Sequence, residues 1–406
     1  MGVSIVNNEV SLAEVSSLED FFTAKLDCKY SVSAPFKSIP DDCDFYYLNE
    51  LAKEDRKDAL SIMQPLIWTT SPVWEKINRN ESGDIQFSLL HDARIYGGRI
   101  TKRTGKLHES GQLLLTNNFE FINASYGVLD GSRSLPKDLV SVEDGEISLN
   151  LEGLVDECIY LKGDYYFLGS LHRHFGHFIV EGLSRLWALD MLPENIRKEI
   201  KFIYYEDSVK PFSLELLKLC GIDAERLISA PRNAIIERIF VPDISYRTHH
   251  WNSRLQQLTY DKISKCITKR HVGSERIYLS RRNIPDRPLR NELEIENLFS
   301  QLGFDIITPE KISITEQISI VKYAKVIAGP VGSQMYLSAF NKLAEKILIL
   351  APANFCLPDD MLLSTCKPTN LHVVLGTCID LSLKKNERSW GFEFKELEVL
   401  VKEILN

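Results

Sequence analysis

Histidine, glutamate and arginine recur at regular spacing between His174 and Arg185, among apolar side chains. If this segment is helical, His177, Glu181 and Arg185 lie four residues apart and share one face. The intervening positions are apolar, which is typical of a buried helix, and a buried charge is costly unless it is paired or used. Three interpretations stay open: a self-satisfied polar network, a base at a cleft, or metal ligation by His174, His177 and Glu181.

A second cluster is basic. The predicted strand RIYLSRR and the loop after it together span fifteen residues. They contain five arginines, at positions 276, 281, 282, 287 and 290. Guanidinium groups grip phosphate oxygens with two parallel hydrogen bonds. The helix expected to start near Asn291 would add backbone N–H donors to the same anion. The alternative is a solvated loop whose arginines pair with Glu292, Glu294 and Glu296.

A strand, a glycine-containing turn and a helix are predicted over the sequence VIAGPVGSQM at 326–335. Gly329 and Gly332 allow backbone N–H groups to approach a phosphate or a sugar closely. The turn lacks the complete G-x-G-x-x-G pattern and the lysine of a P-loop. Because its strand is assigned to the same sheet as the arginine-bearing strand, both loops are expected at one carboxyl edge.

Other common catalytic and metal-binding patterns are absent from the sequence. There is no HExxH motif, no G-x-S-x-G elbow, and no D-x-D motif in a suitable loop. Asp359 and Asp360 follow a predicted strand and are expected to be solvated. The 8 cysteines form no C-x-x-C pair, which favours a reducing, cytoplasmic setting over a disulfide framework or a structural zinc site.

Composition excludes several classes of protein. The chain has 406 residues, 44% hydrophobic and 26% charged, with a net charge of −8. This balance is typical of a globular protein with a sizeable core and argues against long disorder or a nucleic-acid coat. The sequence contains no run of 18 uncharged apolar residues, so no membrane span is expected. The first twenty residues lack the pattern of a secretory signal.

Hydrophobic periodicity divides the chain into parts. Residues 1–84 are expected to form a mixed, β-rich extension, and the region 85–150 short antiparallel strands and hairpins. Beyond residue 155, strands alternate with helices, and HFGHFIVEGLSRLWALDML is predicted as one helix. We therefore expect an α/β domain over 85–255, a Rossmann-like domain over 256–385, and a C-terminal helix within 386–406 that packs back.

With its three motifs in chain order, the sequence resembles glycosyltransferase family 61 from about residue 85 to 350. The resemblance rests on HFGHFIVEGLSRLW, on IYLSRRN with the R and NE that follow, and on LGFDIITPEKISITEQISIVKYAKVIAGPVGS with the helix after it. It implies a GT-B-like fold of two facing Rossmann-like domains. The implied activity is inverting transfer of a hexosyl or pentosyl group from a nucleotide sugar, held by the C-terminal domain, to a hydroxyl of a glycan acceptor.

The resemblance also assigns residues. Carried over by motif, the donor-binding residues are Arg281, Arg282, Asn291, Glu292, Gly329, Gly332 and Ser333. The two basic or polar clusters add Arg287, His174 and Arg185 as substrate or donor contacts. His177 and Glu181 match the histidine and the acidic residue that close the first motif. Two departures concern donor recognition, because many relatives have histidine in place of Val331 and asparagine in place of Leu337.

The chemistry of the implied reaction fits these residues. A site without a bound metal must neutralise the departing diphosphate with protein donors, which paired arginines supply. No metal cofactor is therefore expected to be required, although a divalent ion is left open. Inversion needs a base opposite the leaving group. Glu181 is expected to be that base, with His177 as the alternative.

The expected partners follow from the same resemblance. They are a UDP-sugar by default and a glycan or lipid-linked glycan acceptor, as in synthesis of capsule or another surface polysaccharide, and not nucleic acid. The protein is expected in the cytoplasm. Whether it contacts the inner face of the membrane is left open, and so is its oligomeric state. Two other functions stay open: a non-catalytic nucleotide- or glycan-binding protein on the same scaffold, and a metal-dependent hydrolase built on the histidines.

Overall fold

The structure is a computed structural model that follows the chain almost continuously from residue 158 onward and in segments before it. It describes residues 3–4, 12–37, 43–47, 82–96, 100–103, 106–109, 113–120, 122, 128–129, 132–133, 140–143, 146–149, 158–205, 209–231, 233–249, 251–269, 272–353, 355, 358–365, 367, 369–379, 382–383 and 387–406. The chain divides into two compact units, each described by itself below. Unit 1 comprises 1–34 and 82–246, and unit 2 comprises 35–81 and 247–406.

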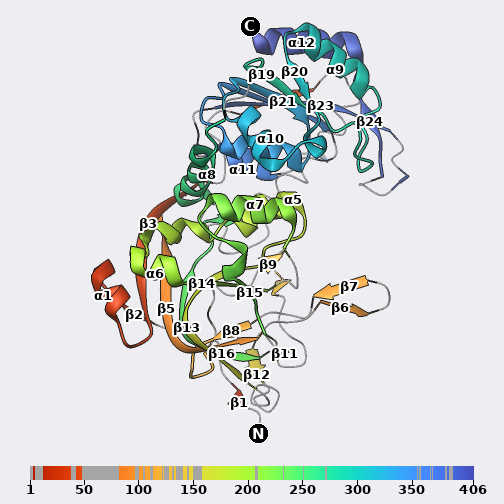
Figure 1. The fold of residues 1–406 in the computed structure, drawn as a ribbon. Helices are drawn as coiled ribbons and strands as arrows, with labels where there is room; N and C mark the ends of the chain where they lie inside the picture. The colour runs from red at the N-terminus through yellow and green to blue at the C-terminus, as the bar shows by residue number, and fades with distance from the viewer. Residues whose placement is uncertain are drawn as a thin grey trace. The chain divides into compact units, whose positions relative to one another are not determined.

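Unit 1 is a mixed α/β unit built on a sheet that combines parallel and antiparallel strands (Figure 1). Its elements are β1 (Val3–Ser4), β2 (Ala13–Glu14), α1 (Leu18–Thr23), β3 (Cys28–Lys37, which continues into unit 2), β5 (Ser82–Tyr96), β6 (Ile100–Arg103), β7 (Lys106–Glu109), β8 (Leu113–Leu115), β9 (Val128–Leu129), β10 (Ser132–Arg133), β11 (Val140–Glu143), β12 (Glu146–Leu149), β13 (Ile159–Gly169), α5 (Phe175–His177), η2 (Phe178–Gly182), η3 (Leu186–Met191), α6 (Glu194–Glu199), β14 (Lys201–Tyr204), α7 (Pro211–Leu219), η4 (Ala224–Arg226), β15 (Leu227–Ser229), β16 (Ala234–Pro242) and β17 (Tyr246–Arg247, at the unit boundary).

Strand β13 organises the sheet of unit 1. It pairs in parallel with β14 on one side and β16 on the other, and β15 extends the parallel set beyond β14. Strand β5 joins β16 antiparallel and carries β8 on its end. The region 85–150 was predicted as short strands. The hairpin β6–β7 and the pair β11–β12 fit that prediction, but β5 is one long strand because its apolar residues from 85 to 95 are buried.

The predicted single helix over 174–192 is wrong. The segment forms a short α-turn, α5, followed by a π-helical turn, η2, and then the 3₁₀ helix η3. The loop that follows β16 holds this irregular course, since Ser245 donates from both its amide and its hydroxyl to the Ser184 carbonyl. π-Helical turns are rare and are often found at functional sites.

Unit 2 is built on a sheet with the strand order β20-β19-β21-β22-β23-β24. Its elements are β4 (Cys43–Tyr47), β18 (Trp251–Ser253), α8 (Arg254–Cys266), β19 (Arg276–Leu279), α9 (Glu292–Gln301), β20 (Asp305–Ile307), η5 (Pro309–Lys311), α10 (Ile314–Val321), β21 (Val326–Pro330), η6 (Ser333–Phe340), β22 (Lys346–Pro352), α11 (Pro358–Ser364), β23 (Asn370–Cys378), β24 (Trp390–Gly391) and α12 (Phe394–Leu405).

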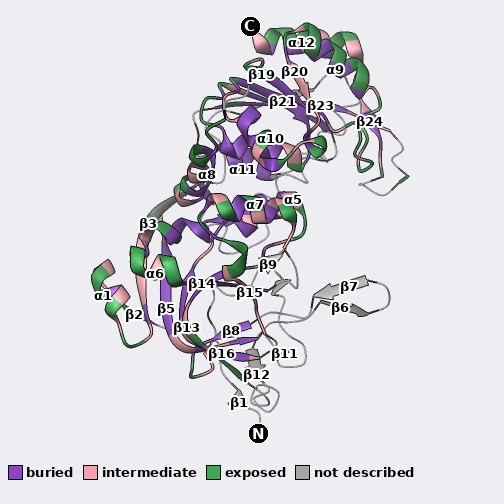
Figure 2. Ribbon diagram, viewed as in Figure 1, coloured by how far each residue is buried: buried purple, intermediate pink, exposed green. Residues whose placement is uncertain are grey.

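The alternation of strands and helices predicted for the C-terminal part is confirmed in unit 2. Strands β20, β19, β21, β22 and β23 are parallel in register, and only the short β24 is antiparallel among the described strands of this order. The central strands are nearly continuous apolar runs and are buried, as expected for a parallel sheet covered on both faces (Figure 2). Ser313 caps α10 by accepting from the Glu316 amide at 3.3 Å, as in a capping box.

The sequence predicts a separate extension over residues 1–84, but the described strands β3 and β4 of this segment belong to the two sheets. Strand β3 lies beside β5 in the first sheet, and β4 pairs in parallel with β23 in the second. The described strands of this segment therefore extend both sheets. Pairing covers exposed strand edges, a benefit that hydrophobic periodicity alone does not reveal.

The C-terminal helix α12 packs against α9. Leu397, Val401 and Ile404 enter the same buried cluster as Ile295 and Phe299 of α9. The core of unit 2 thus fixes α9, whose first turn carries Glu292. In the part of the chain that the structure describes, no helix is long and apolar enough to cross a membrane.

Replacing Ile295 by alanine should lower the free energy of unfolding by about 2–5 kcal/mol, because its side chain is fully buried in this cluster. Leu293→Ala on the same helix is the matched control, since Leu293 is 53% exposed, and should change stability by less than about 0.5 kcal/mol. Urea denaturation measures both. Equal losses in the two variants would contradict this packing.

Candidate active site

Two loops that the sequence analysis expected at one sheet edge do meet there. Strands β19 and β21 are adjacent and parallel, so the loops after Leu279 and after Pro330 leave from the same carboxyl edge. A Cβ atom on Gly329 would lie 2.7 Å from the Leu279 carbonyl oxygen, and one on Gly332 would lie 2.7 Å from Arg281 Nε. Close approach to backbone therefore requires glycine at position 329, while Gly332 lies directly against the side chains of Gln334 and Arg281.

Arg281 carries a positive charge in a crowded position. Its guanidinium donates to the Asp286 carbonyl. The pKa of Arg281 is lowered to about 10, chiefly by burial and also by the like charge of Arg287. Asp286 and Glu292 act in the opposite direction. The group is still protonated near neutral pH, and the like charge of Arg287 favours binding of an anion nearby.

Buried carboxyl groups beneath the arginine loop hold its backbone. Glu292 Oε1 accepts from the Arg281 amide at 2.6 Å, and Glu296 Oε1 accepts from the Ser280 hydroxyl at 2.6 Å. Arg282 Nε lies 3.4 Å from Glu296 Oε2. The side chain of Arg282 thus pairs with a glutamate, as the alternative interpretation of the sequence predicts. Arg281 contacts Glu292 through its backbone amide.

Glu292 has an unusual environment. It is 3% exposed at the first turn of α9, and burial raises its pKa from 4.5 to about 7, with a further raising contribution from Glu296. The Arg281 amide and the charges of Arg281 and Arg282 act in the opposite direction. Its geometry assigns Glu292 to loop support.

The other predicted donor residues surround this loop. Asn291 Nδ2 donates to the Phe392 carbonyl at 3.1 Å, and the Trp390 indole donates to the Arg287 carbonyl at 3.0 Å, so the C-terminal segment braces the loop. Arg287 adopts a positive φ of 52° and places its guanidinium 4.3 Å from the centre of the Phe355 ring. Ser333 is exposed at the start of η6.

Asp359 and Asp360 were expected to be solvated, and this expectation is wrong. They are 1% and 5% exposed, in the first turn of α11, the helix that follows β22, which is the neighbour of β21. Asp359 accepts from the His249 amide at 2.8 Å and from the Tyr336 hydroxyl at 3.2 Å. Burial and the Asp359 charge raise the pKa of Asp360, whereas Arg287 lowers it. The helix after the carboxyl end of β22 thus adds acidic groups, and Asp360 lies near Arg287.

The two positions that depart from the family pattern belong to the core of unit 2. Val331 is 1% exposed and its amide donates to the Leu350 carbonyl at 2.7 Å, while Leu337 is fully buried in η6. Their side chains pack inside the unit.

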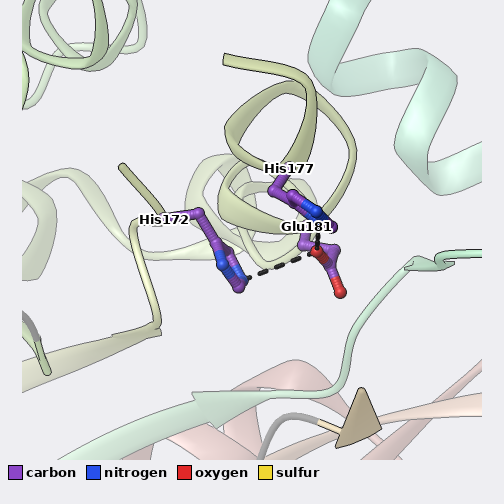
Figure 3. Close-up of side chains that lie close together, drawn as sticks. All are labelled: His172, His177 and Glu181. Atoms are coloured by element: carbon purple, nitrogen blue, oxygen red, sulfur yellow. Dashed lines mark hydrogen bonds and ion pairs between the residues drawn. The ribbon is translucent and has the colours of Figure 1, made fainter. Parts of the chain in front are cut away.

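A second polar group lies in unit 1, after the carboxyl end of β13 (Figure 3). His177 Nδ1 lies 2.6 Å from Glu181 Oε2, so the predicted pair is formed. His172 Nε2 lies 3.6 Å from the same carboxylate oxygen. Sequence reasoning missed His172; the signal was present as three histidines within six residues, at 172, 174 and 177.

The hypothesis of metal ligation by His174, His177 and Glu181 chose the wrong histidine. The donor atoms that converge, all within 4.8 Å of one another, belong to His172, His177 and Glu181. His174 has an extended backbone before α5, is exposed, and meets His177 edge-on at 6.3 Å between ring centres. His172 adopts a positive φ of 24°, and its ring stacks on that of His177.

Arg185 does not continue the polar face as the helix prediction expected. It lies beyond the π-helical turn, is 5% exposed, and its guanidinium donates to the Pro242 carbonyl and lies 5.1 Å from the centre of the Phe167 ring. A Cβ atom on Gly169, which has a φ of 70°, would lie 2.8 Å from Arg185 Nε. Burial lowers the pKa of Arg185 to about 10. These contacts tie η2 and η3 to the strand ends.

One family model matches a region that includes residues of both units. Residues 175–349 match the family model described as Glycosyltransferase 61. The match includes His177 and Glu181 in unit 1, and the arginine loop and glycine turn in unit 2. It begins after His172 and His174. Among curated proteins, none matches the chain.

The raised pKa of Glu292 predicts a pH-dependent stability. Because folding favours the protonated carboxyl, its contribution is fully present below pH 4.5 and is lost as the pH rises to about 7. Glu292→Gln keeps an oxygen for the Arg281 amide and removes the charge. The variant should therefore be more stable than the wild type above pH 7, by at most about 3 kcal/mol, and equal to it near pH 4.5.

Denaturation of both proteins across this pH range measures the difference. Glu294→Gln, an exposed glutamate on the same turn of α9, is the matched control. A Glu292→Gln curve that runs parallel to that of the wild type at every pH would refute the assignment.

Proposed function

The chain is a glycosyltransferase of family 61, and we propose that it transfers a sugar, with inversion, from a nucleotide-sugar donor to a hydroxyl of a glycan acceptor. The nucleotide sugar is held by unit 2, at the carboxyl edge formed by β19, β21 and β22. The acceptor hydroxyl is activated by the His177–Glu181 pair of unit 1. The donor is a UDP-sugar by default, and the organisation is of the GT-B type that the family resemblance implies.

One observation carries the donor site: the Arg281 side chain lies against Gly332, at the point where two parallel strands end. Ligands of open α/β sheets bind outside the carboxyl ends of the strands. Here that position combines a glycine turn that permits close approach with guanidinium groups of Arg281 and Arg287 that repel one another. A diphosphate supplies the negative charge that relieves this repulsion.

The same groups support the departure of the nucleoside diphosphate. As the glycosidic bond breaks, negative charge accumulates on the phosphate oxygens. Guanidinium donors that are already in place stabilise that charge without reorganisation, and they are more effective where water is excluded. No metal ion is required for this step, because the arginines perform the neutralisation.

The base of the reaction is Glu181 or its partner His177. Their 2.6 Å contact lets the histidine orient the carboxylate, or the carboxylate fix the tautomer of the histidine. In either case one of the two takes the proton of the acceptor hydroxyl as that oxygen attacks the anomeric carbon from the face opposite the diphosphate.

The biological setting that we propose is synthesis of capsule or another surface polysaccharide. The acceptor is a growing glycan, free or lipid-linked, and the protein acts in the cytoplasm. A lipid-linked acceptor requires the protein to work at the inner face of the membrane. These elements extend the transferase assignment and are tested after the donor nucleotide is known.

Arg281→Ala should weaken nucleotide binding at least about tenfold, because one charge-assisted hydrogen bond contributes about 1.5–3 kcal/mol. A thermal-shift titration with UDP, GDP, CDP, CMP, ADP and dTDP, each with and without magnesium or manganese, first identifies the nucleotide and then measures the loss. Arg281→Lys, which keeps the charge and loses the planar fork, should have an intermediate effect.

Arg276→Ala is the matched control, since Arg276 is an exposed arginine at the amino end of the same strand. It should leave the nucleotide affinity unchanged. If it weakens binding as much as Arg281→Ala, or if no nucleotide shifts the melting temperature, the donor site is placed wrongly.

Glu181→Gln should keep donor affinity and lower kcat by about 10²–10⁴, the range for loss of a general base. The amide has nearly the same shape as the carboxylate but accepts no proton. Donor affinity comes from the nucleotide titration, and turnover from release of nucleoside diphosphate. Near-normal turnover in this variant, together with a large loss in His177→Ala, would transfer the role of base to His177.

A further inference from the structure

The unit 1 cluster comprises His172, His177 and Glu181. The proposed sugar transfer gives no role to His172. A base with one orienting partner is complete with His177 and Glu181. A third residue is nevertheless aimed at the same carboxylate oxygen, with His172 Nε2 at 3.6 Å (Figure 3). The residues matched by the family model begin at 175, so that match assigns no role to His172.

The chemistry of the three donor atoms is specific. Two imidazole nitrogens and one carboxylate oxygen form a ligand set of the kind that binds Zn²⁺ and neighbouring first-row divalent ions. Zinc sites with three protein ligands keep a further position for water or another small ligand. An open position is consistent with side chains that are 21%, 39% and 18% exposed for His172, His177 and Glu181.

The distances are close to those that an ion needs. In a tetrahedral site with bonds of about 2.0–2.1 Å, the ligand atoms lie about 3.3 Å apart. The His172–Glu181 separation of 3.6 Å is already near this value, and the His177–Glu181 separation of 2.6 Å needs to open by less than about 1 Å. All three donor atoms lie within 4.8 Å of one another.

The backbone positions the histidines for this convergence. His172 has a φ of 24°, in the left-handed region that residues other than glycine rarely occupy, and such strain is often found at functional sites. This conformation stacks its ring on that of His177, with 5.5 Å between ring centres and 30° between planes. The four-residue spacing of His177 and Glu181 supplies the other two ligands from one turn.

We propose that His172, His177 and Glu181 bind Zn²⁺ or a similar first-row divalent ion, and that the bound ion blocks sugar transfer. The blocking half rests on the proposed function. A cation bound to Glu181 and His177 draws off the electron density with which either group takes the acceptor proton, so metal binding suppresses base catalysis. The ion is thus an inhibitor at the acceptor side of the reaction and is separate from donor binding in unit 2.

Binding is tested with Co²⁺, a spectroscopic substitute for Zn²⁺, added to the full chain after chelator treatment. The wild type should develop visible d–d bands that saturate at one equivalent. His172→Ala should weaken this binding at least about tenfold, since loss of even an outer partner of a metal ligand costs about 10–100-fold. Bands that persist unchanged in His172→Ala overturn the site.

His91→Ala is the matched control. His91 lies 3.5 Å from Asp27 in the same unit, as a histidine–carboxylate pair outside the convergent group. Its removal should leave the Co²⁺ bands unchanged. Equal loss in His91→Ala and His172→Ala would mean that the bands report a general effect of histidine removal and would also overturn the site.

Inhibition is tested by adding Zn²⁺ to the transferase assay, with each variant compared with its own metal-free rate. The wild type should lose activity and recover it with chelator, and His172→Ala should need at least about tenfold more Zn²⁺ for the same inhibition. If the ion binds but leaves the rate of sugar transfer unchanged, or raises it, the proposed inhibition is wrong. Because the Co²⁺ bands require no turnover, an inactive wild type that still shows them would refute the transfer reaction and support the site.

Discussion

The close contact between the ends of β19 and β21 is the constraint on which the arginine loop of unit 2 depends. Two parallel strands deliver their loops to one edge, and Gly329 lets the Leu279 carbonyl pass at a distance that no side chain would allow. Gly332 then leaves space for the Arg281 side chain. The Arg281 side chain is thereby placed at the shared edge of the two strands.

Buried acidic groups balance the arginines without neutralising their side chains completely. Glu292 holds the loop through a backbone amide, Glu296 holds it through Ser280 and Arg282, and Asp360 lies near enough to Arg287 to affect its pKa. The raised pKa values of Glu292 and Asp360 express the cost of this arrangement. A structure that tolerates buried carboxyl groups in order to position cations is typical of a site prepared for an anion.

In unit 1 the decisive feature is irregular backbone. A regular helix would have placed Arg185 on the face of His177 and Glu181, but the π-helical turn η2 and the Ser184–Ser245 contacts turn the chain so that Arg185 packs against Phe167. The polar pair remains at the end of β13, where His172 joins it. One carboxylate therefore faces two imidazoles, an arrangement that suits proton transfer or a metal ion but not both at once.

The sequence by itself determined the α/β class, the parallel sheet of unit 2, the resemblance to glycosyltransferase family 61, and the residues that could carry charge. Each of these depends on local periodicity or on motifs read along the chain: apolar runs for β21 to β23, five arginines after one strand, and a histidine four residues before a glutamate. Tertiary structure decided the rest. The pairing of β4 with β23, the burial of Asp359 and Asp360, and the approach of His172 to Glu181 all depend on packing or on a left-handed backbone angle, which no local pattern encodes.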